Sequence, residues 1–135
     1  MIQIVKDADT RPWFFLQTAH TTYGMRVMET GHLEHLYYGE RITVDSQDPA
    51  SCAPLVIQRA FAPGNTCTYD REHPQISMED VCLEVGTLGK GDIREPFLEV
   101  RFADGSVTSD FTFDSYKIIT LKEREQCLQD SGSGN

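Results

Sequence analysis

Two histidines and a glutamate lie close together as His32, Glu34 and His35, and these residue types can bind zinc or move protons. A zinc hydrolase of the H-E-x-x-H type needs both histidines on one face of a helix. Here the histidines are three apart in a stretch with strand-like alternation, which points them to opposite faces. We therefore interpret them as histidines of a sheet surface and core edge, and expect no metal site.

Carboxylates are the second candidate group. The chain has 21 aspartate and glutamate residues, and a hydrolase acting through two carboxylates needs only one pair at the correct separation. A small hydrolase built on Asp70, Glu72 and His73 would require a cleft, and no βα repeat is present to build one. The sequence also contains no G-x-S-x-G, Walker or G-x-G-x-x-G motif. We expect no catalytic residue in this chain.

A glycine-rich turn with both charge signs spans residues 90–96 (KGDIREP). Backbone N–H groups of such a turn hold phosphate when a strand precedes it and a helix follows. A strand is expected to follow here, which argues against phosphate binding. Pairing of Arg94 with Asp92 or with Glu95 would instead fix the turn, which could also contact another domain.

Composition excludes several classes of protein. The net charge of −9 argues against binding to nucleic acid or to an anionic membrane. The first residues do not resemble a signal peptide, and no apolar run is long enough to cross a bilayer. We expect a soluble, cytoplasmic protein. The four cysteines form no C-x-x-C pair, so free thiols are expected, although two disulfides remain open.

The dominant periodicity is two, which predicts strands. Asp104-Gly105 between two alternating runs is a strong hairpin signal. A single helical turn is possible near 78–84, where Ser77 loosely fits a capping box. Strands are expected at residues 2–5, 13–18, 23–28, 33–38, 97–102, 107–113 and 115–121.

These elements predict an all-β fold, an antiparallel β-sandwich or part of one. The domain is expected to span residues 1–121. Residues 122–135 are charged and then rich in glycine and serine, which predicts a disordered tail.

Five stretches together resemble the amino-terminal region of glycoside hydrolase family 36 α-galactosidases, in the family's order and approximate spacing. The resemblance covers most of residues 10–120, and the pattern is lost beyond Ile118. The stretches are 15–23 (FLQTAHTTY), 31–39 (GHLEHLYYG), 59–65 (RAFAPGN), 89–96 (GKGDIREP) and 104–111 (DGSVTSDF).

The resemblance implies a partial, galactose-mutarotase-like supersandwich that precedes a catalytic barrel. In that family two barrel aspartates perform retaining hydrolysis of terminal α-galactosides, and neither has a counterpart here. The implied role is structural, with no cofactor. The implied partners are the catalytic barrel of the parent chain and neighbouring subunits of a homo-oligomer. The implied sugar contacts are Gln58 and Arg59. The family often has Asp at the position of Gln58, so an uncharged amide would make that contact here.

A free-standing carbohydrate-binding module is the alternative hypothesis. It would use exposed aromatic rings, because sugar CH faces stack on such rings. The candidate rings are those of Trp13, Tyr37, Tyr38 and Tyr69. The apolar run around Trp13 favours a core position for that ring instead.

Overall fold

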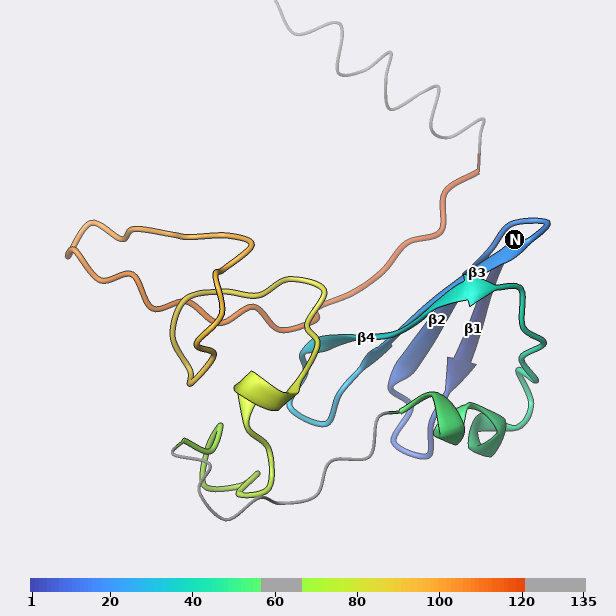
Figure 1. The fold of residues 1–135 in the computed structure, drawn as a ribbon, viewed down its shortest axis with the longest axis horizontal. Helices are drawn as coiled ribbons and strands as arrows, with labels where there is room; N and C mark the ends of the chain where they lie inside the picture. The colour runs from blue at the N-terminus through green and yellow to red at the C-terminus, as the bar shows by residue number, and fades with distance from the viewer. Residues whose placement is uncertain (57–66, 121–135) are drawn as a thin grey trace, which may run out of the picture.

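The computed structural model describes residues 1–56 and 67–120. Four strands form one antiparallel sheet in the order β1-β2-β3-β4, so that consecutive strands are neighbours (Figure 1). Two 3-10 helices, η1 and η2, follow the sheet. The elements are β1 (Ile2–Lys6), β2 (Pro12–Gln17), β3 (Thr21–Val27), β4 (Leu33–Glu40), η1 (Pro49–Leu55) and η2 (Met78–Asp80).

The central strand β2 shows why these residues form a sheet. Its sequence PWFFLQ carries aromatic side chains on both faces, which suits a strand covered on both sides. Short turns connect the strands, and Gly31 between β3 and β4 has φ of 86°, a conformation that glycine adopts without steric cost. The four predicted amino-terminal strands are therefore confirmed to within a few residues.

One face of the sheet holds the hydrophobic core. The buried side chains of Val5, Trp13 and Phe15 pack there with Val44 and Cys52. The segment that contains η1 supplies the last two of these residues and covers this face (Figure 1). Burial of these apolar groups is the main driving force for the fold of residues 1–56.

The opposite face is crossed by residues 110–119, which we call the strap. The Phe14 ring lies 6.0 Å from the Phe113 ring and 5.1 Å from the Tyr116 ring, measured between centroids. The Phe113 N–H also donates to the Gly31 carbonyl over 2.7 Å. The strap therefore ties the end of the described chain back to the first strands.

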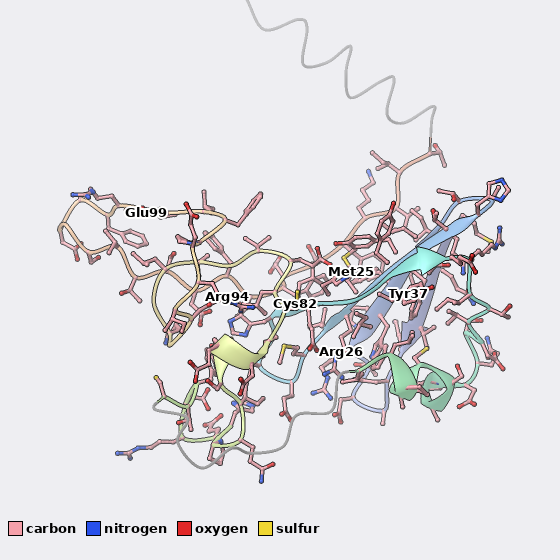
Figure 2. The ribbon with its side chains drawn as sticks, viewed as in Figure 1. Met25, Arg26, Tyr37, Cys82, Arg94 and Glu99 are labelled. Atoms are coloured by element: carbon pink, nitrogen blue, oxygen red, sulfur yellow. The ribbon has the colours of Figure 1, made fainter. Side chains whose placement is uncertain are left out.

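The outer edge of β4 is covered by residues 82–84. The His35 N–H donates to the Cys82 carbonyl, and the Glu84 N–H donates to the Leu33 carbonyl. Glu34 and Leu83 form an isolated antiparallel bridge there. This short pairing starts a projection, residues 85–109, which we call the limb. Figure 2 shows Glu99 out on the limb, away from Met25 and Tyr37 of the sheet.

The hairpin predicted in the limb is only partly formed. Gly105 has φ of 85°, its N–H donates to the Phe102 carbonyl, and the Phe102 N–H donates to the Ser106 carbonyl. The Asp-Gly turn is thus confirmed. The described residues 97–102, 107–113 and 115–120 contain no regular strand, so the prediction of strands there is wrong. The Phe97 and Leu98 N–H groups donate to the Gly86 carbonyl, and the Ser109 N–H donates to the Leu88 carbonyl. These groups therefore do not pair with the facing arm of the hairpin.

The helical turn predicted near 78–84 is present as η2, although it is only three residues long. Ser77 makes no side-chain capping bond, so the capping-box interpretation is wrong. Among the described residues no helix is long and apolar enough to cross a membrane. The all-β, antiparallel fold class is confirmed. The described residues contribute one regular sheet to it.

Candidate functional site

The two residues that the resemblance placed at the sugar, Gln58 and Arg59, lie outside the described residues. Their contact with a ligand therefore stays a prediction. The described chain offers one polar pocket and two polar clusters as further candidates, and each is built from segments that are distant in sequence.

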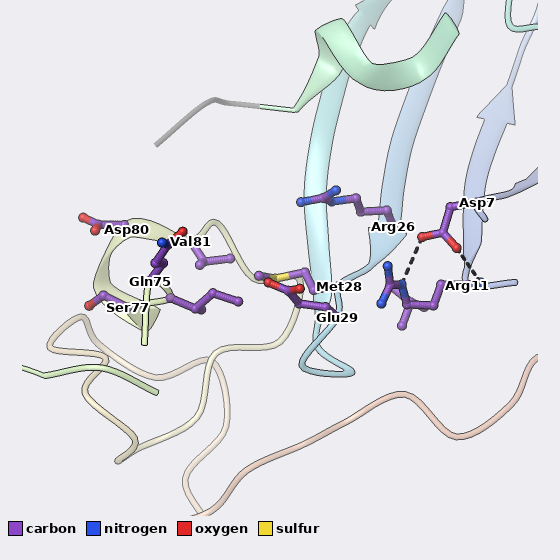
Figure 3. Close-up of a pocket in the computed structure, with 11 residues that line it drawn as sticks. Asp7, Arg11, Arg26, Met28, Glu29, Gln75, Ser77, Asp80 and Val81 are labelled. Atoms are coloured by element: carbon purple, nitrogen blue, oxygen red, sulfur yellow. Dashed lines mark hydrogen bonds and ion pairs between the residues drawn. The ribbon is translucent and has the colours of Figure 1, made fainter. Parts of the chain in front are cut away.

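The polar pocket has a volume of about 340 Å³ and lies between the turn ends of the sheet and the segment around η2. Figure 3 shows Asp7 and Arg11 on one side, Gln75 and Ser77 on the other, and Glu29 between them. Charged and amide groups of this kind bind hydroxyl-rich molecules or ordered water. The lining residues are Asp7, Arg11, Arg26, Val27, Met28, Glu29, Gln75, Ile76, Ser77, Asp80 and Val81.

The cations of this pocket are already engaged. Arg11 Nε donates to Asp7 Oδ2 over 3.0 Å, and Arg26 Nε donates to Glu34 Oε2 over 2.7 Å. The Arg26 guanidinium also lies 5.2 Å from the centroid of the Trp13 ring, a cation–π contact. These interactions fix both arginines and leave less of their charge for a ligand.

Asp7 is held ionised in this arrangement. Burial acts to raise the pKa of Asp7, but hydrogen bonds and the charge of Arg11 outweigh it and lower that pKa below its ordinary value. A general acid needs a raised pKa near the working pH. Asp7 is therefore suited to holding Arg11 and the turn between β1 and β2, and not to donating a proton.

The first polar cluster joins the sheet to the strap through Asp110. His32 Nε2 and Asp110 Oδ1 are 2.5 Å apart, and the Tyr69 hydroxyl donates to Asp110 Oδ2 over 2.6 Å. Thr30 Oγ1 lies 2.7 Å from the other ring nitrogen of His32. Burial, then the hydrogen bond and charge of Asp110, raise the pKa of Tyr69 to about 12.

A hydroxyl, a histidine and a carboxylate in a row have the composition of a nucleophilic triad. His32, however, is only 3% exposed, and neither Thr30 nor His32 lines any of the three described pockets. We interpret the cluster as a structural latch, which agrees with the predicted core-edge role of His32.

The second polar cluster holds residues 82–84 against the sheet. The Tyr23 hydroxyl donates to Glu84 Oε2 over 2.5 Å, and His35 Nδ1 lies 3.1 Å from Glu84 Oε1. Burial, then Glu84, raises the pKa of Tyr23 to about 12. His35 thus contacts a different partner from His32, as expected for side chains on opposite faces.

Arg94 organises the base of the limb. Its Nε donates to Asp92 Oδ1 over 2.9 Å, and its Nη2 donates to the carbonyls of Met78 and Val81. Figure 2 shows Arg94 beside Cys82 at this junction. Of the two pairings predicted for this turn, the one between Arg94 and Asp92 is present. The carbonyl contacts of Arg94 were missed, because they join residues 13 and 16 positions apart.

The aromatic residues that could form a sugar platform do not gather on one surface. Trp13 is 6% exposed and Tyr38 is 69% exposed. The Tyr37 hydroxyl donates to the Glu40 carbonyl, and the Tyr69 hydroxyl is bound to Asp110. Of the four candidate rings, only Tyr38 is highly exposed, which argues against a carbohydrate-binding platform.

Asp70 and His73, two of the three residues considered for a small hydrolase, lie together on a loop. His73 Nδ1 lies 2.8 Å from Asp70 Oδ1, and the two residues are three apart on a loop. Neither residue lines a described pocket. Within residues 1–56 and 67–120 no group of three or more potential ligands could hold a metal ion. Cys52, Cys67 and Cys82 are free thiols, and Cys127 lies outside the described residues.

The fold and these clusters define an antiparallel β domain in which Glu34, Glu84 and Asp110 hold distant segments together. Residues 31–130 match the family model of the glycosyl hydrolase family 36 N-terminal domain, and the chain belongs to this family. The match continues beyond Ile118, where the sequence pattern was expected to be lost.

Relatives support the same assignment. The chain is 35% identical over 116 residues to the bifunctional alpha-galactosidase/sucrose kinase AgaSK of Mediterraneibacter gnavus, covering 85% of this chain and 12% of the relative. It is 29% identical over 111 residues to the alpha-galactosidase AgaA of Geobacillus stearothermophilus, covering 82% and 14% of the two chains.

Among solved structures, the alpha-galactosidase from Lactobacillus brevis is similar with a TM-score of 0.68 and 33% identity, covering 84% of this chain and 14% of that one. The chain thus spans only about one seventh to one eighth of the length of its relatives.

Proposed function

We propose that this chain serves as the non-catalytic amino-terminal β segment of a retaining α-galactosidase, whose full-length form hydrolyses terminal α-D-galactosides. The observation that carries the proposal is the match of residues 31–130 to the family 36 N-terminal domain. The long-range contacts of two carboxylates support the same conclusion, because Asp110 and Glu84 each hold two parts of the fold together.

The partners in this proposal are the catalytic barrel of the parent chain and neighbouring subunits of a homo-oligomer. The parent enzyme works in the cytoplasm in this account. Gln58 and Arg59 supply one edge of the sugar site, since an amide and a guanidinium both form hydrogen bonds with sugar hydroxyls. The match of residues 31–130 includes both of these positions, which supports their assignment.

Hydrolysis of p-nitrophenyl α-galactoside tests the proposal. The chain alone is expected to be inactive. A chimera in which this chain replaces the matching segment of the Lactobacillus brevis alpha-galactosidase is expected to be active. Activity of the chain alone would contradict the non-catalytic assignment, and an inactive chimera would contradict the proposed role as a segment of an α-galactosidase.

Sugar contact is tested separately in the same chimera. Gln58→Ala and Arg59→Ala are expected to raise KM with little change in kcat, as loss of a ground-state contact does. Gln47→Ala, an exposed amide on the loop before η1, is the matched control and should leave KM unchanged. Equal KM values for all three variants would remove Gln58 and Arg59 from the sugar site.

A further inference from the structure

The limb combines a formed turn with arms that do not pair. The turn at Gly105 is closed by backbone hydrogen bonds to Phe102. In the described chain, the arms 99–101 and 107–108 make no backbone hydrogen bond to each other. The sequence of both arms alternates as in strands, so the limb has the local chemistry of a β-hairpin without its ladder.

The limb also exposes large apolar side chains. Phe97 is 79% exposed and Ile93 is 82% exposed, while Leu98 and Phe102 are 42% and 46% exposed. These four side chains lie within residues 93–102, and exposed apolar surface on a soluble protein commonly marks a contact with a partner. Unpaired backbone groups beside these side chains add a second reason for a partner, because an extended edge pairs readily with another strand.

An apolar groove lies where the limb meets the strap. Its volume is about 240 Å³, and its lining residues are Leu33, Val85, Leu98, Phe111, Thr112 and Phe113. The polar clusters do not reach it. An apolar side chain of a neighbouring strand would fill such a groove and bury the Leu98 and Phe111 side chains that are now exposed.

From these features we propose that the limb is a docking surface for an apolar β-strand from the remaining part of an α-galactosidase, and that docking completes the hairpin ladder. The occupant follows from length, since the matched segment is only 14% of the Lactobacillus brevis enzyme and most of that chain lies outside it. This inference rests on the proposed function. It adds that the limb is the surface that contacts the rest of the enzyme, and that its hairpin ladder forms on contact.

Amide hydrogen exchange in two full chains tests this inference. One is this chain by itself, and the other is the chimera with the Lactobacillus brevis alpha-galactosidase. The amides of Val100, Arg101, Val107 and Thr108 are expected to exchange rapidly in the isolated chain. In the chimera they should exchange at least about tenfold more slowly, because ladder hydrogen bonds form.

Substitution of Phe97 separates docking from local folding. Phe97→Lys should leave the isolated chain as stable as before, since the side chain is already 79% exposed. In the chimera the same change should restore rapid exchange and increase the rate of heat inactivation at least about tenfold, whereas Phe97→Leu should keep protection. Fast exchange of the limb in an active chimera, or no effect of Phe97→Lys there, would overturn the docking inference while leaving the proposed function intact. A chimera that does not fold would overturn both.

Discussion

The sheet with η1 and the limb are made from similar residues, but they are held together differently. In residues 1–56, Val5 and Phe15 are fully buried in one core, and four strands pair in a single antiparallel sheet. In the limb, residues 85–109, Phe97 and Phe102 lie exposed, and backbone hydrogen bonds form at the turn and at the base but not between arms 99–101 and 107–108. Apolar side chains stabilise a fold only where something covers them, and the limb lacks that cover.

The junction between the two regions depends on polar groups. Asp110 bonds to His32 and Tyr69, and Arg94 bonds to the carbonyls of Met78 and Val81. These hydrogen bonds attach the limb to the rest of the chain, but they bury none of its apolar side chains. The comparison therefore predicts large effects of substitutions in the sheet, intermediate effects at the junction and small effects in the limb.

The largest effect is expected for Phe15→Ala. Phe15 is fully buried in the core, and truncation of a buried phenylalanine costs about 3–5 kcal/mol of unfolding free energy. Phe102→Ala removes a ring that is 46% exposed and should change the unfolding free energy by less than about 0.5 kcal/mol. Urea denaturation of both variants measures the difference. Equal losses would show that the limb belongs to the same packed unit as the sheet.

Asp110→Ala should cost about 1–3 kcal/mol, because His32 and Tyr69 lose a shared acceptor in a buried setting. The Phe113 amide, which donates to Gly31, should then exchange faster with solvent. Asp114→Ala is the control, since Asp114 is exposed and accepts a bond from neighbouring Ser115. A loss of unfolding free energy in Asp110→Ala alone supports the latch, and an equal loss in Asp114→Ala contradicts it.

Gly31 in the sheet region and Gly105 in the limb have the same backbone conformation, with φ angles of 86° and 85°. Replacing each by alanine compares its cost in the two regions. Alanine at Gly31 also meets Thr112 of the strap at 3.3 Å, and we expect a loss of about 1–2 kcal/mol. At Gly105 a Cβ meets nothing within 4 Å, and the limb is loosely attached. Thermal unfolding should show a smaller shift for Gly105→Ala, and a larger one would contradict the comparison.

Alkaline pH should loosen both polar clusters. The pKa values of Tyr23 and Tyr69 are raised to about 12, so the folded state binds these protons more tightly than the unfolded state. Their contribution to stability is fully present below the ordinary tyrosine pKa of about 10 and is lost as pH rises from there through about 12. Unfolding of the wild type and of Tyr69→Phe across this range measures it. Parallel curves for the two proteins would contradict the role of Tyr69.

A small effect is also expected at the pocket rim. The lowered pKa of Asp7 means that its ion pair with Arg11 stabilises the fold above the ordinary aspartate pKa and is lost as pH falls through the lowered value. Asp7→Asn should cost under about 1 kcal/mol at neutral pH and nothing at low pH, since partly exposed pairs are weak. Asp9→Asn, at a side chain that is 71% exposed, is the control in acid denaturation.

The amino-terminal strands could be predicted because each carries period-two alternation or, in β2, a short aromatic run, between turn residues. Asp104-Gly105 likewise predicts its turn, since φ at the glycine is a local property. The ladder beyond that turn was predicted wrongly, because pairing depends on cover that a local pattern does not contain. The latch between His32 and Asp110 spans 78 positions, and no short motif signals such a contact. Gln58 and Arg59 rest on the family resemblance and stay a prediction.

Amide hydrogen exchange of the isolated chain, measured residue by residue, tests the contrast between sheet and limb most directly. The amides at Phe14 and Met25 in the sheet are expected to be strongly protected, and those at Val100 and Thr108 in the limb to exchange close to the unprotected rate. Comparable protection of all four amides in the isolated chain would contradict the account, since the limb would then be complete without a partner.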